Sequence, residues 1–202
     1  MTFKTLITTF ILGLFSIHSW AQSNYEKKII VHRDSINYVF ADTSTSILLP
    51  EDIEGFKGLN YFDPDEKWLV QAKFRRSIFG RTFKMQTSTE RLPVYKKYGV
   101  LIFYVNGKKV KLSVYQNVAL SKKEEYKNYL FCPFRDLTAP DESYGGGRYI
   151  DLDKSKLSKR TSIDFNLSYN PYCAYNYKYS CPIPPRENHI DVRIEAGIKK
   201  WH

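Results

Sequence analysis

The dipeptide Asn106-Gly107 constrains the fold of this chain most, because both residues tolerate the positive φ angles of a two-residue hairpin turn. Residues alternate between apolar and polar on either side of it, as in strands with one buried face. A turn here pairs Phe103 with Val110 and Leu101 with Leu112 on an apolar face. The opposite face then carries mixed pairs, Tyr104 with Lys109 and Ile102 with Lys111. This pattern predicts an antiparallel sheet with one side in water.

The spacing of apolar residues changes along the chain, from the helical period to the alternation of strands, which predicts helices first and strands afterwards. Ser23 and Glu26 form a capping-box pattern. An apolar stripe at helical spacing follows, in which His32 is expected to be a packing residue. Pro50 predicts a second short helix, ending by Gly58. Further strands are expected near residues 68–75, 82–87, 129–134, 148–152, 161–166 and 190–196.

These elements predict a mostly β protein with one or two short N-terminal helices. The expected architecture is a single antiparallel β-sandwich or a partly open barrel over residues 22–202. No composition shift or linker divides that stretch, so we expect one β-rich domain.

The first 21 residues have the pattern of a signal peptide. Lys4 precedes an apolar run of about a dozen residues, shorter than the roughly 20 that a membrane span needs. Ser19-Trp20-Ala21 then supplies small residues at the two positions that signal peptidase reads. We therefore expect cleavage before Gln22 and export to the periplasm or beyond, with no membrane span in the processed chain.

The net charge of +10 falls to +9 when the leader and its Lys4 are removed. Lysines occur in short pairs along the chain, and no nucleic-acid-binding motif accompanies them. We therefore expect no nucleic-acid partner. A basic surface that contacts an anionic envelope polymer is the better interpretation.

Three cysteines remain after cleavage: Cys132, Cys173 and Cys181. Two of them lie eight positions apart, and in an oxidising compartment we expect a Cys173–Cys181 disulfide. A nucleophilic Cys173 would need a nearby base, and few histidines are present. The spacing is not that of a zinc site, so no metal is expected, and nothing in the sequence indicates a cofactor.

The segment from residue 131 to 197 contains several distinctive motifs. They are Phe131-Cys132-Pro133-Phe134-Arg135-Asp136, Ser143-Tyr144-Gly145-Gly146-Gly147-Arg148-Tyr149, Ile163-Asp164-Phe165-Asn166, Tyr169-Asn170-Pro171-Tyr172-Cys173, Cys181-Pro182-Ile183-Pro184-Pro185-Arg186-Glu187-Asn188 and Glu195-Ala196-Gly197. In this order and spacing the sequence resembles the domain of unknown function 1684 family, in the version found in exported Bacteroidetes-type members. The resemblance implies a single β-rich domain of unknown biochemical activity. Ala139-Pro140 departs from the Asn-Gly that is common in the family, and Ser143 stands where Thr is usual.

The same motifs supply the candidate site residues. Three glycines followed by Arg148 suit either an anion cradle or a tight turn. Asp164, Asn166 and Asn170 suit either a polar site or a loop brace. We expect a polar pocket with Arg148 at its electrostatic centre. The ligand-binding candidates are Arg148, Asn166, Asn170, Asn188, Tyr149 and Tyr172.

Two functions from different classes remain open. The first is a non-catalytic ligand-binding β-domain for a small or polymeric anionic ligand. The second is a hydrolase-like enzyme in which Asp164 and Glu187 serve as acid and base. The two carboxylates would have to line one open pocket for the second interpretation to hold.

Overall fold

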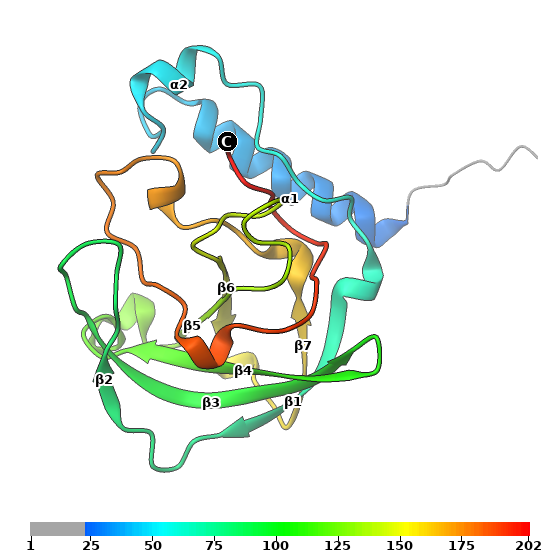
Figure 1. The fold of residues 1–202 in the computed structure, drawn as a ribbon, viewed down its shortest axis with the longest axis vertical. Coiled ribbons are helices and arrows are strands. Elements are labelled where there is room, and N and C mark those ends of the chain that lie inside the picture. Colours follow the sequence, from blue (N-terminus) through cyan, green and yellow to red (C-terminus); the bar gives the residue numbers. More distant parts are fainter. Residues whose placement is uncertain (1–22) are drawn as a thin grey trace, which may run out of the picture.

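The computed structural model describes residues 23–202, so the predicted signal peptide lies outside the described residues. Its centre is an antiparallel sheet that curls into a half-barrel (Figure 1). The strand order is β6-β5-β4-β3-β1-β7, with β2 added to the start of β3. The strands are β1 (Leu69–Arg76), β2 (Thr82–Lys84), β3 (Val94–Val105), β4 (Lys108–Asn117), β5 (Tyr129–Phe134), β6 (Arg148–Asp153) and β7 (Arg160–Asp164). Of the two expected architectures, the molecule therefore adopts the partly open barrel.

Two α-helices precede the sheet, α1 (Asn24–Ala41) and α2 (Pro50–Glu54). The capping box predicted for α1 is present, since Ser23 Oγ accepts from the Glu26 N–H and the Glu26 carboxylate accepts from the Ser23 N–H. Short 3₁₀ helices occupy many of the connections: Glu66–Trp68, Leu120–Lys122, Glu124–Tyr126, Lys154–Lys156, Phe165–Leu167, Tyr172–Ala174 and Arg186–Asn188. No helix in residues 23–202 is long and apolar enough to span a membrane.

The β3–β4 hairpin forms in the predicted register. Asn106 and Gly107 both have positive φ, 50° and 76°. All four predicted pairs form, and the apolar face is at most 4% exposed. This face belongs to the main hydrophobic core inside the half-barrel, together with Trp68, Ile163 and Phe165.

The expected strand over residues 190–196 does not form. Alternate side chains from Ile190 to Ala196 do pack into the main core, as a strand would place them. The backbone carbonyls of Ile194 and Ala196, however, accept hydrogen bonds from the Arg148 guanidinium instead of from a neighbouring strand. The alternation of apolar residues does reflect the burial of one face of this segment. The hydrogen bonds that a neighbouring strand would make to its backbone are made instead by the buried Arg148 side chain.

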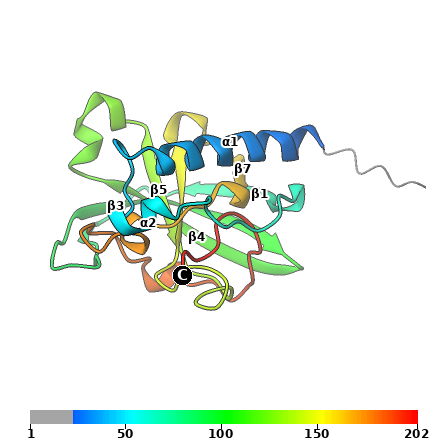
Figure 2. The same ribbon diagram turned by 90° about the horizontal axis from the view of Figure 1, so that it is seen from above.

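The half-barrel leaves its two edge strands, β6 and β7, unpaired with each other, and α1 lies outside the sheet near this opening (Figures 1 and 2). A second apolar cluster packs beneath α1 and α2 around Phe40, Leu59, Tyr175 and Ile198. Further along, Tyr169 pairs with Tyr149 of β6, where two backbone hydrogen bonds of 2.8 and 3.0 Å bridge the opening. The rest of the opening between β6 and β7 is not bridged by backbone hydrogen bonds among the described residues and lies beside α1.

Candidate functional site

Two adjoining hollows occupy the space between α1 and the sheet edges. One, of about 500 Å³, lies between β6, β7 and α1, and the other, of about 420 Å³, continues under α1 toward Tyr172. Both are lined by the same five residues where they meet: His32, Ile36, Asp151, Leu167 and Tyr169. We call the combined space the α1 cleft.

A polar network holds the N-terminal end of α1 over this cleft. The Tyr25 hydroxyl donates to Asp164 Oδ1 at 2.8 Å and accepts from Asn166 Nδ2 at the same distance. Asn166 also pairs through its amide with the backbone of Asp65, donating to the carbonyl at 2.9 Å and accepting from the N–H at 3.1 Å. The predicted pair Asp164 and Asn166 thus joins β7 to α1, and both residues border the cleft.

Asp151 is the polar centre of the α1 cleft. Its Oδ1 accepts hydrogen bonds from the hydroxyls of Tyr129 at 2.8 Å and Tyr169 at 2.6 Å. Within residues 23–202 its Oδ2 accepts no hydrogen bond, and no Lys or Arg forms an ion pair with it. Asp151 is an exposed residue that faces the cleft, and the protein around it buries only part of the carboxylate. This burial raises the pKa of Asp151, against the lowering effect of the two hydroxyls.

The rest of the wall under α1 is mainly apolar and aromatic. Val39 and Tyr172 line it while half exposed. The same wall includes Asn170 and Tyr61, whose buried Oδ1 and hydroxyl atoms have no hydrogen-bond partner among the described residues. An apolar cleft with a few unpaired polar groups is the usual form of a small-molecule site.

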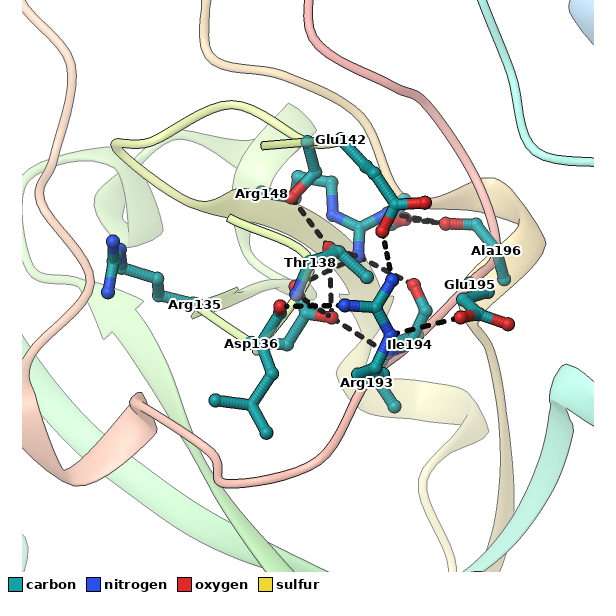
Figure 3. A network of polar contacts seen from close by, with 12 residues as sticks. Arg135, Asp136, Thr138, Glu142, Arg148, Arg193, Ile194, Glu195 and Ala196 are labelled. Atoms are coloured by element: carbon teal, nitrogen blue, oxygen red, sulfur yellow. Dashed lines mark hydrogen bonds and ion pairs between the residues drawn. The ribbon is translucent and has the colours of Figure 1, made fainter. Parts of the chain in front are cut away.

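Arg148 does not lie in this cleft but is fully buried in the core (Figure 3). Its guanidinium donates to Asp136 Oδ1 at 3.0 Å and to the carbonyls of Ile194 and Ala196. The predicted contact between Arg148 and a carboxylate is therefore present, but it braces the C-terminal segment and leaves no accessible donor. The expectation that Arg148 forms the centre of an open pocket is wrong.

Asn188 and Tyr149 are also structural. The buried Asn188 amide accepts from the Ser113 N–H at 2.7 Å and donates to the Ser113 and Pro133 carbonyls at 2.8 and 2.6 Å, so it binds β4 to β5. Tyr149 is 5% exposed, and its hydroxyl donates to the Pro182 carbonyl. Neither side chain is available to a ligand.

Glu187 lies away from the α1 cleft. Its carboxylate accepts from Tyr115 at 2.6 Å and from Lys97 at 2.7 Å, and it borders a separate hollow beside β4. Burial acts to raise the pKa of Glu187, but the hydrogen bonds from Lys97 and Tyr115 outweigh it and hold that pKa below its usual value. Because Asp164 and Glu187 line different hollows, the structure does not support them as an acid–base pair.

The expected disulfide is not formed, since Cys132, Cys173 and Cys181 are all free. The two predicted partners nevertheless lie together, and the Cys173 N–H donates to Cys181 Sγ at 3.1 Å. A hydrogen bond from the Cys181 thiol lowers the pKa of Cys173 to about 6, while burial raises that of Cys132 to about 12. The eight-residue spacing thus identified a contact and not a covalent bond.

Four of the predicted residues converge on the α1 cleft: Asp164, Asn166, Asn170 and Tyr172. Sequence reasoning missed Asp151 altogether and treated His32 only as a packing residue. The available signal was the alternation along β6, which places Asp151 on the same side as Tyr149 and opposite to the core residue Ile150. The sequence did not predict that the hydroxyls of Tyr129 and Tyr169 would both donate to the carboxylate of Asp151.

The fold and the cleft together define a half-barrel β protein with a helix over its open side. The family model for proteins of unknown function named DUF1684 matches residues 54–199, and the chain belongs to this family. It is similar to the solution NMR structure of an uncharacterized protein from Haloarcula marismortui, with 33% sequence identity and a TM-score of 0.66. That similarity covers 87% of this chain and 94% of the other. No curated protein matches the sequence.

Proposed function

We propose that this protein binds a small ligand in the α1 cleft, with Asp151 as the polar anchor. The observation that carries the proposal is a carboxylate with one free oxygen, no cationic partner among the described residues and a raised pKa, placed between apolar walls. A titratable side chain that lies in a cleft and has a perturbed pKa is a candidate functional residue. The ligand would carry an apolar body and a cationic or hydrogen-bond-donating group.

This chemistry differs from the anionic ligand expected from the sequence. The expected anion receptor, Arg148, is enclosed by its own partners. The cleft presents three carboxylates, Asp151, Asp153 and Asp164, against one lysine, Lys156. An organic amine or a hydroxyl-bearing ligand therefore complements the site better than an anion does.

The test is a binding screen by thermal shift and calorimetry with matched sets of organic amines, neutral sugars and organic anions. We expect amines with an aromatic or aliphatic body to raise the melting temperature, and Asp151→Asn to abolish that effect. Glu125→Gln is the matched control, because it removes an exposed carboxylate outside the cleft. Stabilisation by anions alone, or amine binding that survives in Asp151→Asn, would reject the proposal.

We also propose that the protein acts outside the cytoplasm. The support is the leader pattern of residues 1–21, with its short apolar run and small residues before Gln22. Intact mass measurement of protein recovered from the periplasm or medium of a bacterial host should show a chain beginning at Gln22. A cytoplasmic chain that retains the leader would contradict it.

A further inference from the structure

The positive charge of this protein is concentrated in one part of the chain. Residues 67–123, which contain β1 to β4, carry fourteen Lys or Arg and a single carboxylate, Glu90. The rest of the chain carries 17 basic and 20 acidic residues, so this segment accounts for the whole net positive charge. The lysine pairs that look scattered in the sequence thus belong largely to one sheet region.

The loop between β1 and β2 carries two solvent-exposed apolar side chains within this basic region. Ile78 is 82% exposed and Phe79 is 90% exposed, the highest values among the large apolar residues described. Arg75 and Arg76 precede the pair, and Arg81 follows it. The loop lies at the end of the molecule remote from α1 (Figure 1).

The base of this loop is fixed to the sheet. The Ser77 N–H donates to the Tyr98 carbonyl at 2.9 Å. Gly80 packs so closely that a Cβ atom there would lie 2.2 Å from the Lys97 carbonyl oxygen, which excludes larger residues. The turn that carries Ile78 and Phe79 is therefore anchored to β3 at both of its ends.

A basic hollow of about 640 Å³ lies directly beside the apolar tip. Its walls include Arg76, Lys96 and Lys154, and Ile78 itself forms part of the rim. No carboxylate lines it, and neither Arg76 nor Lys96 forms an ion pair within the described residues. Ser77 and Gln116 add hydrogen-bonding groups to the same wall.

We propose that this end of the molecule binds the surface of an anionic lipid bilayer. Ile78 and Phe79 would enter the boundary between headgroups and acyl chains, and the adjoining hollow would receive a lipid phosphate. A second copy of this chain is a poor occupant, because it would bring the same basic surface into contact with itself. A soluble anionic polymer satisfies the charges but offers nothing apolar to the two exposed side chains.

The test measures flotation of the purified protein with vesicles. Vesicles that mix phosphatidylglycerol and phosphatidylcholine in equal parts should bind it, and vesicles of phosphatidylcholine alone should not. Ile78→Ser combined with Phe79→Ser should weaken binding by about tenfold or more, since two large apolar side chains no longer leave water. Arg76→Gln combined with Lys96→Gln should weaken it by a similar factor, as each basic group near an anionic surface contributes about fivefold.

Lys109→Gln combined with Lys111→Gln is the matched charge control, because it removes two exposed lysines from the β3–β4 hairpin and leaves the tip intact. It should bind at least about fivefold more tightly than the Arg76/Lys96 double variant, which loses the same net charge. All variants should keep the circular dichroism spectrum and melting temperature of the parent. A second readout is Phe79→Trp, whose fluorescence should shift to the blue on anionic vesicles.

Two results would overturn the proposal. One is equal vesicle binding by the parent and by the Ile78/Phe79 double variant, which would leave charge alone as the cause. The other is an unshifted emission of the Phe79→Trp variant together with tight binding to soluble polyphosphate, which would identify an anionic polymer as the partner of this surface.

Discussion

Arg148 is the residue whose environment differs most from the one expected, and its substitution gives the clearest test at the residue scale. Arg148→Ala leaves the Asp136 carboxylate buried without its partner and removes donors from the Ile194 and Ala196 carbonyls. Breaking a buried ion pair of this kind costs about 3–5 kcal/mol of unfolding free energy. Urea denaturation followed by circular dichroism measures it.

The control for this prediction is Arg193→Ala. Arg193 pairs with Glu142 and Glu195 in the same neighbourhood but is half exposed, so its loss should lower the free energy of unfolding much less than the loss of Arg148 does (Figure 3). Equal destabilisation by the two substitutions would show that Arg148 is not the brace described above.

Asp151 should reduce stability at neutral pH, because its pKa is raised in the folded state. A raised carboxyl pKa means that the folded protein holds a proton more tightly than the unfolded chain, so stability falls as the pH rises through that range. Asp151→Asn keeps an acceptor for Tyr129 and Tyr169 but cannot ionise. We expect this variant to be more stable than the parent at pH 7 and to lose that advantage below about pH 4, near the unfolded pKa.

Unfolding free energies measured in urea across this pH range are the appropriate readout. An advantage of Asp151→Asn that stays constant with pH would mean that ionisation of Asp151 is not its cause.

Cys173 should be the reactive thiol of the reduced protein. The hydrogen bond from Cys181 lowers the pKa of Cys173 to about 6, so it is largely thiolate at pH 7, whereas Cys132 is fully buried. Iodoacetamide labelling followed by peptide mass spectrometry should modify Cys173 first and Cys132 only after denaturation. Cys181→Ala should slow the labelling of Cys173, and an unchanged rate would mean that the neighbouring thiol does not activate it.

At the scale of elements, the hydroxyl of Tyr25 helps to hold the N-terminal end of α1 over the cleft. Tyr25→Phe removes the hydrogen bonds to Asp164 and Asn166 and should cost about 1 kcal/mol. Hydrogen exchange should accelerate at the start of α1 and stay unchanged in β3 and β4. Tyr38→Phe, which alters a 76% exposed side chain of the same helix, should change neither.

The elements also show what local sequence can and cannot predict. The capping box of α1 and the Asn106-Gly107 hairpin were predictable because their geometry depends on residues only a few positions apart. The segment from 190 to 196 was predicted wrongly because its backbone partner is Arg148, more than 40 residues away. The α1 cleft has one predictable part and one unpredictable part. The polar motif around Asp164 could be identified from neighbouring residues in the sequence. Its position next to α1 and Asp151 could not, because that position depends on how the sheet curls.

At the scale of the whole molecule, we predict that the apolar clusters unfold together. Trp68 belongs to the main core and Trp201 packs against the cluster under α1. In the chain that begins at Gln22, Trp68→Phe and Trp201→Phe each leave one fluorescent reporter. Their urea transitions should coincide with each other and with the loss of circular dichroism, as a single cooperative domain requires. Separate midpoints would divide residues 22–202 into two units.

The uneven distribution of charge between residues 67–123 and the rest of the chain gives the molecule a permanent electric dipole moment. Near a negatively charged surface such a molecule experiences a torque as well as an attraction, so it turns before it touches. The effect extends over about 10 Å at 0.1 M salt and fades at higher ionic strength. Because the β1–β2 loop lies at the end remote from α1 (Figure 1), the arriving molecule would carry α1 on the side that faces away from the surface.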